Sequence, residues 1–111
     1  IGLIIGREVT QEGVKILRMV DFIGDVIDLS FIGKKIDDLL VDNHYEYIDF
    51  LLEGVPENIM NMAGFKLKRN NGTIVPNYFQ PYILSNVETW FEKSSENMIL
   101  FKGDADADRP N

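Results

Sequence analysis

The sequence predicts an α+β domain, with a mixed, mostly antiparallel sheet of five to six strands flanked by two main helices. Two apolar stretches at residues 1–9 and 14–23 are joined by a short polar loop. Apolar residues then recur at steps of three and four between residues 26 and 40. Because 111 residues suit one domain, we expect it to cover residues 1–103, followed by an acidic tail at residues 104–111.

The N-terminal third of the chain has the pattern of a β-hairpin. Residues 1–9 and 14–23 are rich in Ile, Val, Leu and Phe, and the polar loop between them ends in Gly13. The second stretch alternates only loosely between apolar and polar positions. We therefore expect it to be a central strand that is buried on both faces.

A helix is expected next, over residues 26–40. Asp25 is suited to cap its N-terminus, and the helix should end near Asp42. Gly33 lies inside the pattern, where it predicts a close packing contact. The apolar face comprises Leu29, Ile32, Ile36, Leu39 and Leu40.

The middle of the chain predicts a strand at residues 45–52 and then a short helix. Pro56 suits the first turn of that helix, and Glu57 suits its positively polarised end. Gly64 suits the C′ position, where a left-handed backbone ends the helix.

The C-terminal part is expected to add short elements around an irregular loop. Pro76 and Pro81 cannot donate ladder hydrogen bonds, so the segment between them should lie at a sheet edge or outside the sheet. The expected elements are a strand at 65–69, a turn at 70–72, a return strand at 73–75, a short helix from 85 to 91, and a strand at 98–101.

Composition excludes several classes of function. The net charge of −7 disfavours nucleic acid and anionic membranes, both of which select basic surfaces. No apolar run approaches the length of about 20 residues that spans a bilayer. The absence of cysteine excludes disulfides and thiolate chemistry, which is consistent with a cytoplasmic protein.

The order of expected elements resembles a known enzyme family. A strand, a short helix and then Gly64-Phe65 opening another strand are common near the C-terminal end of GCN5-related N-acetyltransferase domains. The resemblance covers roughly residues 1–101 and is closest to the uncharacterised acetyltransferase-like proteins of this type. It lacks the first strand and first helices of the family. Since Ile1 would begin in mid-strand, we expect a fragment of a longer chain.

The chain departs from the family where the family carries its chemistry. Family members bind the acyl-CoA pyrophosphate on a basic, glycine-rich strand-to-helix turn. The matching turn, residues 22–28, contains one glycine and two aspartates, and Met60 stands where the family has its tyrosine acid. The resemblance therefore implies a degenerate domain without catalytic, cofactor-binding or metal-binding residues of its own. Acetyl-CoA would bind only if the rest of the full-length protein supplied the site.

The aromatic loop at residues 76–82 is the candidate for a substrate-facing wall. It presents Asn77, Tyr78, Phe79 and Tyr82, and prolines hold irregular loops where binding residues tend to lie. The alternative is that these aromatic residues are core, together with Trp90 and Phe91.

Two acids, Asp21 and Asp49, interrupt apolar strands and need partners if those strands are central. Asp49 is a candidate substrate contact and Asp21 a candidate base. For Asp21 the alternative is a structural pair with Lys or Arg.

Two other candidates have plain structural explanations. His44 is the only histidine, and without a nucleophile or metal partner it is expected to be a surface loop residue. Aspartates alternate at positions 104, 106 and 108 as in calcium loops, but the turn glycine and distal glutamate of an EF-hand are absent. A solvated acidic tail is the simpler interpretation.

Three functions are compatible with these observations. The first is a degenerate acetyltransferase-like C-terminal domain that contributes scaffold or substrate contacts. The second is a dimerising interaction module, because residues 1–5 form an apolar edge strand without charge or proline. The third is a complete acyltransferase acting on a sugar or an amine. The expected partner is a second copy of the chain or the missing N-terminal portion.

Overall fold

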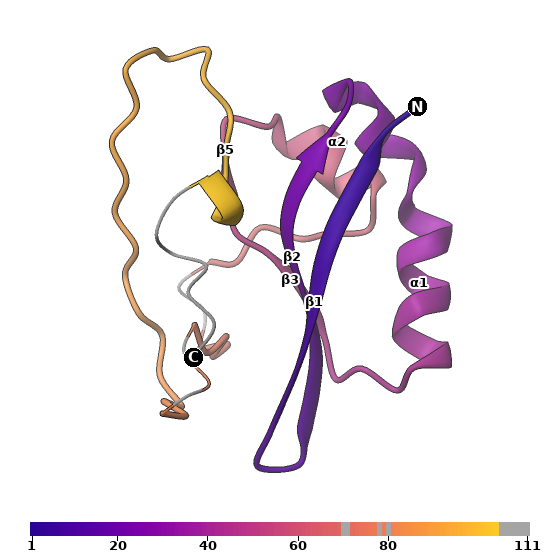
Figure 1. The fold of residues 1–111 in the computed structure, drawn as a ribbon, viewed down its shortest axis with the longest axis vertical. Coiled ribbons are helices and arrows are strands. Elements are labelled where there is room, and N and C mark those ends of the chain that lie inside the picture. The colour runs from indigo at the N-terminus through magenta and orange to yellow at the C-terminus, as the bar shows by residue number, and fades with distance from the viewer. Residues whose placement is uncertain (70–71, 78, 80, 105–111) are drawn as a thin grey trace.

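The computed structural model describes residues 1–69, 72–77, 79 and 81–104. The predicted α+β class is confirmed, but the prediction of one sheet is wrong. The strands of these residues form a three-stranded sheet in the order β1-β2-β3 and a separate two-stranded sheet of β4 and β5 (Figure 1). The larger sheet is mixed, because β1 is antiparallel and β3 parallel to β2.

The predicted hairpin is confirmed. Strands β1 (Leu3–Gln11) and β2 (Val14–Ile23) pair antiparallel, with a register shift between Ile5 and Gly6. Glu12 and Gly13 connect them with φ values of 51° and 78°, the two positive angles that a type I′ turn requires. Strand β2 lies at the centre of its sheet, as predicted.

The single helix expected at residues 26–40 is two elements in the structure. A 3₁₀ helix, η1 (Val26–Phe31), precedes α1 (Gly33–Asp42). The division falls at Gly33, where an added Cβ would lie 3.1 Å from the Met62 carbonyl oxygen. Gly33 therefore starts a helix at a close backbone contact instead of lying within one.

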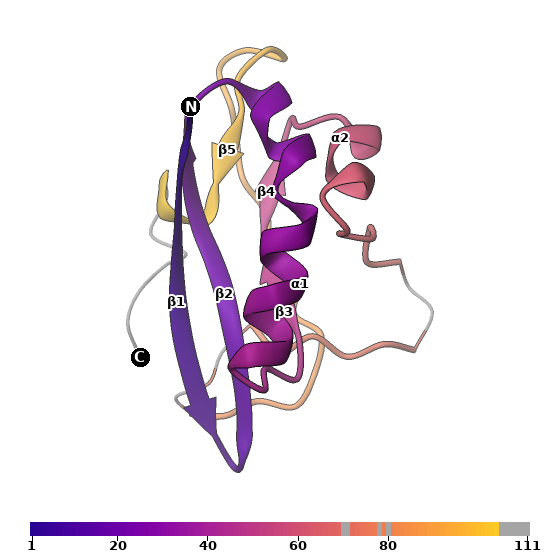
Figure 2. The ribbon, with the colours of Figure 1, turned by 90° about the vertical axis from the view of Figure 1, so that its right-hand side faces the viewer.

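Helix α1 connects two parallel strands and covers one side of the larger sheet (Figure 2). Its partner strand β3 (Ile48–Phe50) pairs with β2, and the next two residues form β4 (Leu52–Glu53). The predicted strand 45–52 is therefore divided. The reason is a change of partner, because β4 pairs with β5 (Leu100–Phe101) instead of continuing along β2 (Figure 2).

The predicted short helix and its glycine stop are confirmed. Helix α2 (Glu57–Met62) follows Pro56. At its end Gly64 has φ +88°, and its N–H bonds the Asn61 carbonyl at 3.0 Å. The Phe65 N–H bonds the Met60 carbonyl at 3.0 Å. These two bonds make a Schellman motif, which satisfies carbonyls that the helix end leaves unpaired.

Three expected elements are absent from the described residues. The predicted strands at 65–69 and 73–75 are not strands, and the predicted helix at 85–91 is not a helix. One reason is visible at Val75, whose N–H bonds the Asn86 side chain instead of another strand. The predicted turn at residues 70–72 and the acidic tail lie largely outside the described residues, which end with η2 (Lys102–Asp104).

The core lies where β2, β3, η1 and β5 meet. Ile16, Met19 and Leu29 are fully buried. The ring of Phe101 joins the two sheets, because it packs 6.4 Å from Phe22 and 5.6 Å from Phe50. In the described part of the chain no helix has the length and apolar character needed to cross a membrane.

Candidate functional site

The candidate site is centred on Arg18, a residue that sequence analysis did not select. Arg18 lies in the middle of β2 and is only 4% exposed. A buried guanidinium is costly unless acceptors surround it, so its neighbours are constrained by its hydrogen bonds. The sequence could have indicated this residue, because Arg18 is a charged residue inside an apolar strand.

Asp49 supplies the negative charge opposite Arg18. The two residues are direct neighbours in the parallel register of β2 and β3. Arg18 Nε donates to Asp49 Oδ1 at 3.0 Å, and Arg18 Nη2 donates to Oδ2 at 2.6 Å. This two-point contact is the geometry that an arginine and a carboxylate favour. Arg18 is therefore the partner that the Asp49 carboxylate needs inside an apolar strand.

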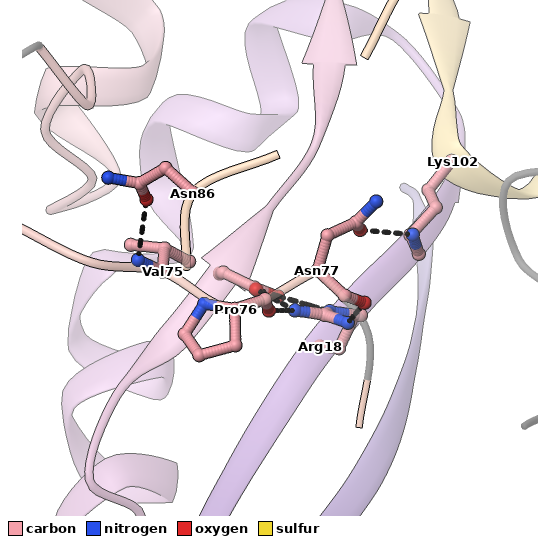
Figure 3. Close-up of polar contacts among 7 residues, drawn as sticks. Arg18, Val75, Pro76, Asn77, Asn86 and Lys102 are labelled. Atoms are coloured by element: carbon pink, nitrogen blue, oxygen red, sulfur yellow. Dashed lines mark hydrogen bonds and ion pairs between the residues drawn. The ribbon is translucent and has the colours of Figure 1, made fainter. Parts of the chain in front are cut away.

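The same guanidinium also binds the backbone of the aromatic loop at residues 76–82. Arg18 Nη1 donates to the Asn77 carbonyl at 2.7 Å, and Nη2 donates to the Pro76 carbonyl at 2.6 Å (Figure 3). The Asn77 side chain is held separately, because buried Lys102 donates to its Oδ1 at 3.0 Å. The loop is thus tied to both β2 and η2.

The aromatic residues of the loop pack around the Arg18 guanidinium. The guanidinium carbon of Arg18 lies 5.2 Å from the centroid of the Phe79 ring, and Phe79 is buried. The Tyr82 ring lies 5.4 Å from Phe79 and is half-buried. The structure therefore brings Asn77, Phe79 and Tyr82 together with Asp49. Tyr78, the fifth predicted substrate contact, lies outside the described residues. That these residues contact a substrate stays a prediction.

Tyr47 is the second residue that sequence analysis missed. Its hydroxyl is buried and has no hydrogen-bond partner among the described residues. Burial raises the pKa of this hydroxyl, and the nearby Asp49 carboxylate raises it further, because both disfavour a phenolate. The available signal was the alternation of Tyr47 and Asp49, which predicts one face of a strand.

The other candidates lie outside this cluster. Asp21 is half-buried, and its carboxylate accepts the Phe22 N–H at 2.8 Å. His44 is exposed beyond the end of α1 with φ +56°. Trp90 is 86% exposed, so it does not belong to the core as the alternative interpretation required. Within the described ranges no three acids or histidines gather as a metal site would need.

The turn between β2 and η1 is acidic, as its sequence predicts. The Asp25 carboxylate accepts the Ile27 N–H at 3.3 Å and so caps η1. Asp28 adds a second carboxylate in the first turn. The N–H groups at this turn therefore face carboxylates of the chain itself, which would oppose an anion bound there.

Comparisons with known proteins found no relative. No family model matches the chain, and no curated protein or solved structure matches it. The acetyltransferase resemblance therefore depends on the order of elements and on residues of this chain alone.

The first prediction concerns the Arg18–Asp49 pair. Arg18→Met should lower the free energy of unfolding by about 3–5 kcal/mol, because Asp49 and two carbonyls lose their donor. Arg18→Met with Asp49→Leu should recover part of that loss, since no charge is then left unpaired. Urea unfolding of the two single variants and the double variant measures the coupling.

Lys34→Met, which breaks the exposed pair with Asp38, is the control and should cost about 0.5 kcal/mol. If the losses in unfolding free energy of the two single variants simply add in the double variant, Arg18 and Asp49 do not stabilise each other and the prediction is wrong.

The second prediction concerns the unpartnered hydroxyl of Tyr47. Tyr47→Phe should leave the Tm unchanged or raise it at neutral pH, because no hydrogen bond is lost. The raised pKa makes the folded state keep its proton, so stability is fully present below a pH of about 10 and is lost as pH rises further. Thermal unfolding followed from neutral to alkaline pH should show a smaller loss in Tyr47→Phe. Tyr45→Phe is the control, since the Tyr45 hydroxyl donates to Glu8 at 2.8 Å and its removal should not stabilise. Destabilisation of Tyr47→Phe at neutral pH would mean that the hydroxyl has a partner.

Proposed function

We propose that this chain is a degenerate acetyltransferase-like domain that supplies scaffold and substrate contacts and has no acyl-CoA loop of its own. The observation that carries the proposal is the capped turn after β2. There Asp25 accepts an N–H of η1 that a phosphate would need, and Asp28 adds a carboxylate that pairs with the N-terminal ammonium of Ile1 at 3.0 Å. A domain with this turn is suited to hold an acceptor or a partner, not a CoA pyrophosphate.

The order and direction of the elements support the proposed ancestry. Strands β2 and β3 are parallel and joined through α1, and α2 then ends in Gly64-Phe65. The position of the family's tyrosine acid is occupied by Met60 in α2, which cannot donate a proton. The chain therefore shares the order from β2 to α2 with the family, but its described residues lack the strand that Phe65 would open, the acid and the anion site.

The proposed substrate contacts lie on the loop that Arg18 holds. Asn77, Tyr78, Phe79 and Tyr82 belong to this loop, and Asp49 lies behind it. Because Arg18 and Lys102 fix the loop at its backbone and at Asn77, the loop is organised before any ligand arrives. Such preorganisation lowers the entropy cost of binding. Tyr82 is the half-exposed aromatic of the described residues in this loop and is proposed as the ligand-facing ring.

The third prediction tests the missing acyl-CoA site. Calorimetry with acetyl-CoA should show no binding heat in the low micromolar range, because carboxylates replace the donors that a pyrophosphate requires. CoA without the acetyl group serves as the control for binding through the nucleotide alone. A one-to-one isotherm with acetyl-CoA that persists in moderate salt would contradict the degenerate interpretation.

A second candidate function is a dimerising module, and the edge of β1 favours it. No strand of the described residues pairs with the outer side of β1. Leu3 and Ile5 are 57% and 39% exposed beside this edge, whereas Ile4 is half-buried. An uncharged apolar edge recruits another strand, and a two-fold pairing of two β1 strands would cover it.

The fourth prediction tests this dimer. Light scattering at tens of micromolar should report about twice the monomer mass, and Ile5→Lys should reduce it, because a charge blocks edge pairing. Thr10→Lys places the same charge on an exposed position at the far end of β1 and should leave the mass unchanged. A strictly monomeric protein, or equal effects of both variants, would argue against the β1 edge as the interface.

A further inference from the structure

Residues 85–93, called the strap below, expose apolar side chains without forming a helix or a strand. Trp90 is 86% exposed, and Val87 and Phe91 are also exposed. Figure 1 shows this part of the chain as an extended segment that runs along one side of the domain. Large apolar residues gathered on one short exposed segment are unusual unless the segment has a second arrangement that covers or uses them.

Side-chain contacts hold the strap near its two ends. Near its start, Asn86 Oδ1 accepts the Val75 N–H at 3.0 Å (Figure 3). Asn86 Nδ2 also donates to the Thr73 carbonyl at 3.0 Å. At its end, Lys93 Nζ lies 3.4 Å from Glu53 Oε1 on β4. Between these anchors, the described backbone of residues 87–92 makes no backbone–backbone hydrogen bond.

The sequence of the strap favours a helix. Ser85 and Glu88 have the spacing of a capping box, in which each side chain satisfies an N–H of the first turn. Val87, Trp90 and Phe91 follow at steps of three and four, which would align them on one helical face. Lys93 would then lie at the C-terminal end, where a positive charge is favourable.

A helix and the two anchors are incompatible in length. A helix advances about 1.5 Å per residue and an extended chain about 3.3 Å per residue. A helical strap would therefore cover less than half the span between Asn86 and Lys93 that an extended strap covers. Helix formation would break at least one anchor, so the two arrangements exclude each other.

We propose that the strap is a two-state segment, which is extended while both anchors hold and becomes an amphipathic helix when they are released. The helical state collects the scattered side chains of Val87, Trp90 and Phe91 into one apolar stripe. The extended state keeps the same residues apart. The anchors thus control whether the domain displays a helical surface.

The test combines anchor removal with carbon chemical shifts of residues 86–92, which distinguish helix from extended chain. Glu53→Ala removes one anchor without changing the strap, because it leaves Lys93 no side-chain acceptor at this position of β4, and Asn86→Ala removes the other. In the double variant we expect a several-fold increase in the helical population of the strap. Adding Thr89→Pro should abolish the increase, because proline disrupts a helix interior.

Thr89→Ala is the matched control for intrinsic propensity, since it favours a helix about as much as Asn86→Ala does but leaves both anchors in place. It should leave the strap extended. The proposal is overturned if Thr89→Ala produces as much helix as Asn86→Ala. It is also overturned if the strap is helical in the unmodified protein, or if the double variant stays non-helical.

Discussion

The buried guanidinium of Arg18 is the constraint on which the rest of the structure depends. A charge in this position must be surrounded by acceptors, and they come from two parts of the chain far from Arg18 in sequence. Asp49 contributes its carboxylate from β3, and Pro76 and Asn77 contribute carbonyls from the loop. One side chain therefore holds the parallel strand pair and the C-terminal loop in a single arrangement. The loop is irregular in backbone but has little freedom where it meets β2.

The domain combines this satisfied interior with surfaces that are left incomplete. Around Arg18 the carboxylate, the carbonyls and the Phe79 ring are all engaged, whereas the outer side of β1 has no strand partner among the described residues. The exposed residues Leu3 and Trp90 lie on such incomplete surfaces. The incomplete surfaces are the part of the domain on which the proposed contacts with another molecule would form.

Much of the candidate site could be anticipated, but its centre could not. The sequence marked Asn77, Phe79, Tyr82 and Asp49 because prolines frame the loop and an acid interrupts a strand. It did not mark Arg18, because the importance of a cation depends on which acceptors fold against it. Arg18 is separated from Asp49 by 31 residues. It is separated from Asn77 by 59 residues, and no local pattern specifies contacts of either kind.

The sequence by itself determined the elements whose interactions are local. The turn at Gly13, the cap at Asp25 and the helix stop at Gly64 each depend on residues only a few positions apart, and all three are present. Tertiary structure decided which strands share a sheet, where the strand predicted at 45–52 divides, and that the helical pattern at 85–91 is extended. The physical reason is that local propensities are worth only fractions of a kcal/mol per residue. Anchors such as Asn86 and partners such as β5 can therefore override them.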